Sequence, residues 1–348
     1  MRSRPAARLF RTLSCLAGLA AALAVPMTGA ARADEEVNVY SYRQEVLIRP
    51  LLDRFTAETG IAVNVVYDRN IMTRLQAEGA NSPADAVLTT DAGRLIRLDH
   101  ADLLQAVSSA VLEEAVPSQY RDPDGHWFGL SVRARPLVHS RDRVDPATLS
   151  TYAALGDPEW RGRICIRSSS NIYNQSLLSA MIAHDGVEAV EAWAGDFVAN
   201  FARVPQGGDR DQIRAVAAGE CDVAVVNMYY LAGMLASDDA AEREAAEKVA
   251  IFWPDQQGHG THVNISGAGV TAHAPNRDNA VRLIEFLAGE EAQRIYAEVV
   301  NEYPVREGTP AAAPIAAFGP FRADDLLLER LAEHNAEAVR LADRVGWR

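Results

Sequence analysis

The sequence contains one lysine and few cysteines. Lys248 is the only lysine among 34 basic residues, so arginine carries the positive charge, which indicates a compositional bias. No H-E-x-x-H, G-x-S-x-G or glycine-rich nucleotide loop occurs in the 348 residues. Nothing in the chain therefore points to a zinc protease, a serine hydrolase or a nucleotide-dependent enzyme. We predict that the protein is not an enzyme.

Long apolar runs are absent except at the N-terminus. There, arginines precede an apolar stretch from Leu13 to Met27, and Ala31-Arg32-Ala33 follows. This order is typical of a secretory signal peptide, and the run is too short for a comfortable membrane span. Cys15 lacks the leucine three residues earlier that a lipoprotein signal needs. We expect residues 1–33 to be removed and a mature chain that is periplasmic and not membrane-embedded.

Net positive charge is also absent. The first 33 residues hold five arginines and no acid, so 29 basic residues face 47 acidic ones in the mature chain, a net charge of about −18. Such a field repels nucleic acid and anionic lipid and tolerates a cationic ligand. No nucleic-acid partner is expected, and the protein is predicted to be a monomer.

Two cysteines, Cys165 and Cys221, remain after cleavage. An even number in an oxidising compartment favours a disulfide. Both lie in strand-like runs, "GRICIR" and "CDVAVV", that can neighbour each other in one sheet. The alternative is a pair of buried free thiols.

The first third of the chain alternates strand-like and helix-like patterns, which predicts a parallel sheet with helices on its faces. Strands are expected at 37–42, 61–67 and 85–90, with helices at 45–59, 71–78 and 92–101. A second lobe of the same kind follows, with helices near 187–200 and 209–218 and a strand at 222–226. Extended chain then returns in "GTHVNISGAGVTAHA", before helices at 276–288, 289–299 and 323–343.

The fold class is therefore α/β with two lobes and a hinged ligand cleft between them. We expect lobe 1 to comprise 34–132 and 265–310, and lobe 2 to comprise 133–264 and 311–348. Ligands of open parallel sheets bind beyond the carboxyl ends of the strands. The segments that follow the second lobe's strands should therefore face the cleft.

Two adjacent tyrosines, Tyr229 and Tyr230, lie where a buried strand is predicted to end and a helix to begin in "GECDVAVVNMYYLAGML". They can simply be packing residues, since tyrosine is amphipathic. They can also bind a trivalent metal, because such an ion displaces the phenol proton and favours anionic oxygen. Tyr173, at the other strand–helix junction, would be a third phenol.

The chain resembles the periplasmic ferric-iron-binding proteins of ABC importers, which have the type II binding-protein fold. The resemblance spans nearly all of the mature chain and rests on "VNVYSYRQ", "GANSPADAVLTTDAGRL", "RDPDGHWFGLSVRAR", "DPEWRGRICIRSSSNIYNQS", "NFARVPQGGDRDQI", "AAGECDVAVVNMYY" and "GTHVNISGAGVT". It implies that the tyrosines of "SNIYNQ" and "NMYY", namely Tyr173, Tyr229 and Tyr230, bind Fe(III). It also implies delivery to an importer's membrane permease.

One departure from that family concerns the first lobe. Many members read "YSSRHY" where this chain reads "YSYRQE", so Gln44 and Glu45 replace a histidine and a tyrosine ligand. Glu45 can offer a carboxylate or simply open a helix, where an acid suits the dipole. Three phenolates would leave coordination positions for water or an anion such as carbonate or citrate.

An anion requires hydrogen-bond donors, and several candidates are at hand. Those expected to contact it are Arg43, Arg133, Ser168, Ser169 and Asn227. Plain N-capping is the alternative for the serines, and surface ion pairing is expected for Arg135. His259 and His262 in "GHGTHV" lack a third ligand nearby and are not expected to bind zinc.

The predicted function is capture of Fe(III) in the cleft and its delivery to an ABC importer. The same fold binding a small organic molecule or oxyanion is the first alternative. A periplasmic enzyme with a metal in the cleft is the second.

Overall fold

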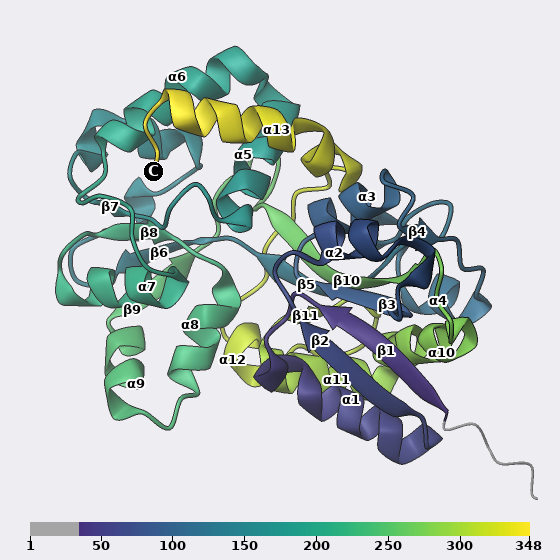
Figure 1. Cartoon of the computed structure of the whole chain (residues 1–348). Helices are drawn as coiled ribbons and strands as arrows, with labels where there is room; N and C mark the ends of the chain where they lie inside the picture. The colour runs from purple at the N-terminus through teal and green to yellow at the C-terminus, as the bar shows by residue number, and fades with distance from the viewer. Residues whose placement is uncertain (1–34) are drawn as a thin grey trace, which may run out of the picture. The chain divides into compact units, whose positions relative to one another are not determined.

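The computed structural model of the protein describes residues 35–348. The predicted signal peptide, its cleavage site and Cys15 lie outside the described residues. The described chain contains a seven-stranded sheet and a four-stranded sheet (Figure 1). We call the seven-stranded sheet with its helices the first lobe, and the four-stranded sheet with its helices the second lobe.

The sheet of the first lobe has the strand order β11-β5-β10-β3-β1-β2, with β4 paired to β10. Its strands are β1 (Glu36–Ser41), β2 (Ala62–Tyr67), β3 (Ala86–Thr89), β4 (Leu104–Gln105), β5 (Phe128–Ala134), β10 (Val263–Thr271) and β11 (Tyr303–Pro304). The first three strands are parallel, as the alternating pattern predicts. However, β10 runs antiparallel to both β3 and β5, so the complete sheet is mixed.

Local sequence signals explain where several helices of this lobe begin and end. Gly60 closes the first helix in the left-handed conformation, with φ of 75°, which glycine adopts without a Cβ penalty. The side chain of Asp91 accepts a hydrogen bond from Gly93 N and so caps the third helix. The helices are α1 (Glu45–Thr59), α2 (Ile71–Glu78), α3 (Ala92–Asp99), α4 (Ala110–Ala115), α10 (Arg277–Ala288) and α11 (Glu290–Val300).

The sheet of the second lobe has the order β7-β8-β6-β9, with β7 and β8 parallel. Its strands are β6 (Leu137–Ser140), β7 (Ile164–Cys165), β8 (Val223–Val225) and β9 (Val249–Phe252). Its helices are α5 (Ile172–Asp185), α6 (Val187–Ala199), α7 (Asp209–Ala218), α8 (Met228–Leu235) and α9 (Ala240–Glu247). Cys165 and Cys221 form a disulfide, with Cα atoms 5.8 Å apart, which confirms that prediction over free thiols.

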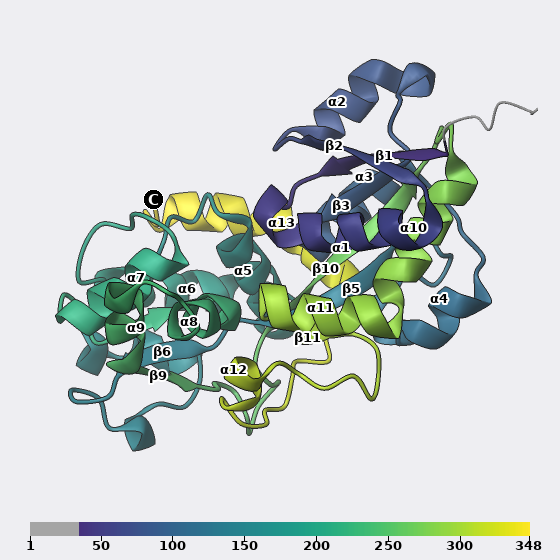
Figure 2. The ribbon, with the colours of Figure 1, turned by 90° about the horizontal axis from the view of Figure 1, so that it is seen from below.

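Two connections join the two sheets and a third leads from the first sheet to the last two helices, as the ribbon of Figure 2 shows from a second direction. The chain leaves the first sheet at β5, returns at β10, and leaves again after β11 for α12 (Ala313–Ala316) and α13 (Glu329–Arg344). The last helix packs against both α5 and α3. The predicted boundaries between the lobes are close to these crossings. Strand β5 of the first lobe extends two residues beyond the predicted end at 132, and β10 begins two residues before the predicted return at 265. The division of the remaining segments between the lobes stays a prediction.

Other differences from the sequence prediction involve short elements. The strands β4 and β9 and the helices α4 and α9 were not predicted. The last helix begins at Glu329 rather than at 323, because Asp324 N instead donates to Thr261 O at 2.9 Å. Short 3-10 turns occur at Gly79–Asn81, Ser118–Tyr120, Pro146–Thr148, Ala153–Gly156 and Pro158–Trp160. Among residues 35–348, the helices are all too short or too polar to cross a membrane.

Candidate functional site

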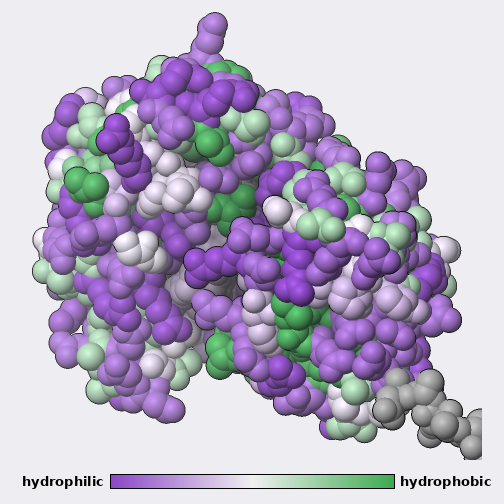
Figure 3. Space-filling view, in the orientation of Figure 1, coloured by the Kyte–Doolittle hydropathy of each residue, from purple (hydrophilic) through white to green (hydrophobic). Residues whose placement is uncertain are grey.

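A cleft of about 720 Å³ lies between residues of the two lobes. Figure 3 shows a hollow between the two halves of this face of the molecule. The first lobe lines the cleft with Tyr42, Arg43, Gln44, Val46, Leu47, Thr90, Glu298, Val299, Val300, Asn301 and Glu302. The second lobe lines it with Tyr173, Arg210, Tyr229, Tyr230, Gly233 and Ala236. All three predicted tyrosines therefore line one cavity.

The topology of the second sheet explains why distant tyrosines meet. Because β7 and β8 are parallel neighbours, the segments after them emerge at the same edge of the sheet. Tyr173 lies in the first turn of α5, where Asn171 Oδ1 accepts from Tyr173 N at 3.0 Å. Tyr229 and Tyr230 lie in the first turn of α8, after Asn227 in extended conformation. Adjacent residues can share one side of a helix start, which they cannot do on a strand.

The three phenols are in mutual contact. Tyr229 donates a hydrogen bond from its hydroxyl to the Tyr173 hydroxyl oxygen at 3.2 Å. The rings of Tyr229 and Tyr230 lie with centroids 4.2 Å apart and planes inclined by 34°. All three side chains are half-buried. The arrangement thus gathers three potential oxygen donors at one point of the cleft wall.

Positive charge surrounds Tyr173. The guanidinium carbons of Arg133, Arg167 and Arg135 lie 5.0, 5.5 and 5.9 Å from its ring centroid. Burial alone would raise the pKa of Tyr173. The charge of Arg133 and the hydrogen bond from Tyr229 outweigh that effect, so the pKa lies below its ordinary value of 10.0.

The other two phenols hold their protons more tightly. Burial, followed by the proximity of Tyr173, raises the pKa of Tyr229 well above 10.0 and also raises that of Tyr230. A phenolate therefore forms most readily at Tyr173, and Tyr229 is arranged to donate a hydrogen bond to it. A ligand that requires all three phenolates must displace the protons of Tyr229 and Tyr230.

Arg133 has unused hydrogen-bonding capacity. Its side chain is buried, with 2% of the residue exposed, and Nη2 donates to Ile265 O at 3.2 Å. Among residues 35–348, its Nε and Nη1 have no hydrogen-bond partner. Buried donors without partners are costly, so these two N–H groups suit an anionic atom at Tyr173. Arg133 is not among the residues that line the 720 Å³ cleft; it lines an adjoining pocket of about 10 Å³ that shares Tyr173 with the cleft. Asn227 lies next to Arg133 and Tyr173 in a small pocket.

Arg135 is not on the surface, so the expectation of surface ion pairing for it is wrong. It is buried and forms an ion pair with Asp209 at 3.2 Å. Arg167 pairs with the other oxygen of Asp209 at 3.0 Å, and Asn227 N donates to the same carboxylate at 2.8 Å. Asp209 thus fixes two arginines near Tyr173. Sequence reasoning missed it, although an acid directly after Gly207-Gly208 at a helix start was a usable signal.

Arg43 belongs to a buried network on the wall of the first lobe. Its Nη2 lies 2.9 Å from both carboxylate oxygens of Glu302. Ser131 and Ser266 also donate to Glu302, the latter at 3.0 Å. Nη1 of Arg43 has no hydrogen-bond partner in the part of the chain that the structure describes. Sequence reasoning did not identify Glu302, because nothing in "VVNEYPV" signals that it pairs with a residue 259 positions earlier.

The structure brings neither Glu45, Ser168 nor Ser169 to the cleft. Glu45 forms an exposed ion pair with Arg49 at 2.8 Å, one turn along α1, which supports the helix-opening alternative. Ser169 donates to Trp347 O at 2.5 Å. Ser168 interacts with Ser170, whose N and Oγ lie 3.1 and 2.9 Å from its hydroxyl. The ligand and anion predictions for these three residues are not supported by their placement.

The two histidines of "GHGTHV" line one small pocket of about 50 Å³, together with His184. His262 is buried, whereas His259 stacks on His184 with ring centroids 3.8 Å apart. Burial, together with the charges of Arg135 and Arg133, lowers the pKa of His262 to about 3. Its imidazole is therefore neutral at pH 7. That the pair does not bind zinc stays a prediction.

Comparison with known proteins identifies the family. The model for bacterial extracellular solute-binding proteins matches residues 61–320. The chain belongs to this family of bacterial extracellular solute-binding proteins. Iron uptake protein A1 of Synechocystis is 46% identical to this solute-binding protein over 316 residues, covering 90% of this chain and 88% of that protein.

Solved structures agree with the family assignment and with the predicted two-lobe fold. A Trichodesmium protein in complex with iron and citrate ligands has a TM-score of 0.86 and 45% identity, covering 90% of this chain and 100% of that one. The apo ferric ion-binding protein A of Pasteurella haemolytica also has a TM-score of 0.86 and 45% identity, with 90% and 98% covered. The predicted type II fold is thereby confirmed.

Proposed function

We propose that this solute-binding protein captures Fe(III) in its cleft through Tyr173, Tyr229 and Tyr230 and delivers it to an ABC importer. The observation that carries the proposal is the convergence of three phenols, with Tyr229 Oη 3.2 Å from Tyr173 Oη and Tyr230 packed on Tyr229. Fe(III) favours anionic oxygen donors, and its charge displaces phenol protons that would otherwise remain at neutral pH. The names of the relatives, an iron uptake protein and a ferric ion-binding protein, support this cargo.

Binding begins at Tyr173 in this proposal. Its hydroxyl has the lowered pKa and already accepts a hydrogen bond, so it becomes the first phenolate. Tyr229 and Tyr230 then exchange their protons for the metal. The positive charge of the ion thus balances the two phenolate charges, which burial would otherwise disfavour.

A small anion completes the coordination in the proposal. Three phenolates fill half of an octahedral shell. On the wall of the first lobe, Gln44 is neutral, Tyr42 Oη accepts a hydrogen bond from Met72 N at 3.2 Å, and Glu298 pairs with Arg294. Arg133 Nε and Nη1 and Arg43 Nη1 are buried donors without partners. Guanidinium groups bind carboxylates or carbonate through paired N–H donors. The iron and citrate ligands of the Trichodesmium structure support a chelating anion of this kind.

The first lobe then acts mainly by closing over the ion. Closure of two lobes about a hinge shields a bound ligand from water. Arg43 would face the anion, and Gln44 would hydrogen-bond rather than coordinate. Delivery requires a membrane permease. It also requires that the cleft reopen, which protonation of a phenolate, loss of the anion or reduction of the iron could trigger. Export of a monomeric mature chain to the periplasm, by the signal peptide predicted at residues 1–33, is part of the proposal.

A visible absorption titration tests the proposal. The purified mature protein, stripped of metal, is titrated with ferric citrate beside the Tyr229→Phe, Tyr230→Phe double variant. Ferric phenolate has a charge-transfer band in the visible range, and we expect that band to saturate near one iron per chain. The double variant should lose it.

Tyr67→Phe is the matched control, since it removes a phenol of β2 that does not line the cleft. Its band should equal that of the parent. Absence of a band in the parent would overturn the iron proposal. Extraction of the bound ligand would then test the alternative of an organic molecule or oxyanion.

A further inference from the structure

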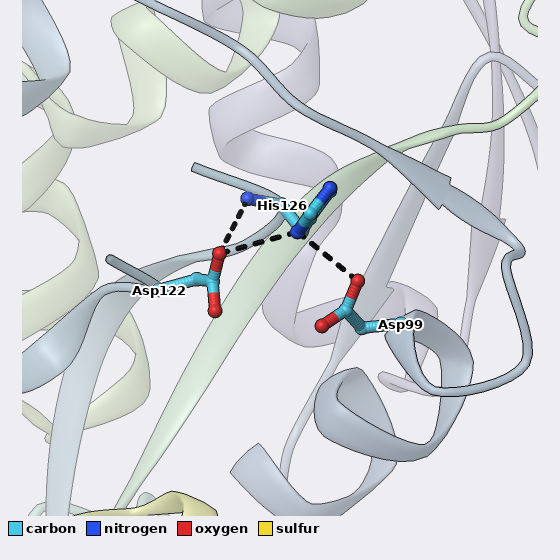
Figure 4. A group of neighbouring side chains, drawn as sticks. All are labelled: Asp99, Asp122 and His126. Carbon is cyan, nitrogen blue, oxygen red and sulfur yellow. Dashed lines mark hydrogen bonds and ion pairs between the residues drawn. The ribbon is translucent and has the colours of Figure 1, made fainter. Parts of the chain in front are cut away.

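A second cluster of metal-ligating side chains lies in the first lobe, outside the cleft. It consists of Asp99, Asp122 and His126, shown in Figure 4. Asp99 is the last residue of α3, whose first residues follow the cleft residue Thr90. At 1.5 Å per residue, the eight-residue helix places Asp99 roughly 12 Å from that end. None of the three residues lines the cleft, so the proposed iron site does not account for them.

The three side chains converge at distances that suit a metal ion. His126 Nδ1 lies 3.1 Å from Asp99 Oδ1 and 3.3 Å from Asp122 Oδ2. One ligand atom from each residue lies within 4.8 Å of the other two. With metal–ligand bonds of about 2.1 Å, neighbouring ligand atoms are about 3.0 Å apart in an octahedron and about 3.4 Å apart in a tetrahedron. The nitrogen–oxygen separations already lie in that range.

The turn that carries two of the ligands is fixed by the backbone. Asp122 Oδ2 accepts hydrogen bonds from Asp124 N and His126 N, both at 3.0 Å. Gly125 has φ of 81°, and a Cβ there would meet Val107 O at 2.5 Å, so only glycine fits the turn. Asp122 and His126 are therefore held in position before any ion binds, which lowers the entropic cost of binding.

The charge around the cluster is not balanced by arginine. Within residues 35–348, neither Asp99 nor Asp122 has an arginine or lysine nitrogen within 4.0 Å, and their only ion-pair partner is His126. Nonetheless, the side chain of Asp99 is only 22% exposed and that of Asp122 only 11% exposed. Asp99 also stands at a helix C-terminus, where the dipole disfavours an acid and favours a cation. The two carboxylates without an arginine or lysine partner and the helix C-terminus would thus both be stabilised by a cation at this point.

We propose that Asp99, Asp122 and His126 bind a divalent transition-metal ion such as Zn²⁺, with water completing its coordination. One imidazole nitrogen and two carboxylate oxygens suit Zn²⁺ or Mn²⁺ better than Ca²⁺, which takes six or more oxygens. On binding, the ion replaces a proton on His126 Nδ1, and that proton passes to solvent. The bound ion would tie the end of α3 to the turn that precedes β5. The alternative is that His126 simply donates a shared hydrogen bond to both acids.

Calorimetric titration of the iron-free mature protein with Zn²⁺ separates the two readings. We expect one Zn²⁺ per chain in the parent and at least about tenfold weaker binding in Asp99→Asn and in His126→Gln. His334→Gln, which removes a histidine of α13 outside the cluster, is the matched control and should bind as the parent does. Ca²⁺ in place of Zn²⁺ should bind more weakly. Equal Zn²⁺ binding in the parent and in both cluster variants, or none in the parent, would overturn the proposal.

A second measurement covers the case in which a cluster variant fails to fold. The His126 side chain is 29% exposed and can react with diethyl pyrocarbonate in the parent protein. Peptide mass mapping should show that Zn²⁺ protects His126 and leaves His334 reactive. Unchanged reactivity of His126 at saturating Zn²⁺ would contradict the proposal.

Discussion

The two lobes line the same cleft with different chemistry. The second lobe contributes three phenols in mutual contact, surrounded by arginines that favour a phenolate at Tyr173. The first lobe contributes Arg43, whose charge is already balanced by Glu302, and the neutral amide of Gln44. It also contributes the single phenol of Tyr42, whose oxygen accepts a hydrogen bond from Met72 N at 3.2 Å, and Glu298, which pairs with Arg294. The second lobe thus gathers three phenol oxygens at one point, whereas the first lobe offers a single phenol, hydrogen-bond donors and ion-paired groups.

This difference separates binding of the metal from closure of the cleft, two tasks that ligands from both lobes could perform together. A metal held by a single lobe can bind while the cleft is open, and closure then serves to retain it. Closure in such a protein depends on the anion and on the arginines rather than on metal bonds from the first lobe. The substitutions below test this asymmetry.

The largest effect is expected for Tyr173→Phe in the second lobe. It removes the phenol with the lowered pKa and the acceptor of the Tyr229 hydrogen bond. Loss of an outer-shell group typically costs 10- to 100-fold in metal affinity, so loss of a proposed ligand should cost more than about 100-fold. Competition with citrate, followed by the visible band, measures it. A variant that retained parental affinity would remove Tyr173 from the site.

A large effect on folding is expected for Glu302→Ala in the first lobe. Arg43 and Glu302 are both only 2% exposed, and removing one partner leaves a buried charge. The expected loss in the free energy of unfolding is about 3–5 kcal/mol, measured by urea denaturation. The double variant Arg43→Met, Glu302→Leu should lose less, because no charge is left unpaired. Equal losses in the single and double variants would show that the ion pair is not the cause.

A pH effect is expected from His262, which lies between the lobes at the start of β10. Above its ordinary pKa of 6.5, the imidazole is neutral in both folded and unfolded chains. Below pH 6.5 the unfolded chain binds a proton, whereas the folded chain does not until about pH 3. The free energy of unfolding should therefore fall by about 1.4 kcal/mol per pH unit in this window.

Urea denaturation of the parent and of His262→Gln, at pH 7 and at pH 5, isolates that contribution. The variant should lose less stability on acidification than the parent does. Identical losses in both proteins would mean that His262 takes up its proton in the folded state as well.

The smallest effect is expected for Glu45→Gln. The carboxylate is exposed and pairs with Arg49, and an exposed pair of this spacing contributes about 0.3–0.5 kcal/mol. Iron affinity should change by less than about threefold in the citrate competition assay. A tenfold loss would instead make Glu45 a ligand and would contradict the asymmetry between the lobes.

The sequence predicted the parts of the fold that local patterns control. The first helix was expected at its observed bounds, since Gly60 marks its end and Glu45 its start. The pattern around Cys165 and Cys221 predicted that β7 and β8 are neighbours in one sheet, and it predicted the disulfide. The antiparallel return of β10 could not be predicted, because strand direction depends on partners far away in the chain.

The same limit applies to the site. The tyrosines stood out because they follow strand ends, whose position a parallel sheet determines. The partners that set their charge, Asp209 for Arg135 and Glu302 for Arg43, come from segments 74 and 259 residues away. Ser168 and Ser169 were predicted from a helix start that lies two to three residues later, where Asn171 caps α5.

A structure of the iron-loaded protein with its anion would test the central claim most directly. The proposal predicts one Fe(III) bonded to the oxygens of Tyr173, Tyr229 and Tyr230, with the remaining positions held by the anion or water. It also predicts Arg133 or Arg43 against that anion and no bond from Gln44 or Glu45. Iron bonded to a side chain of the first lobe, or iron remote from the three tyrosines, would contradict it.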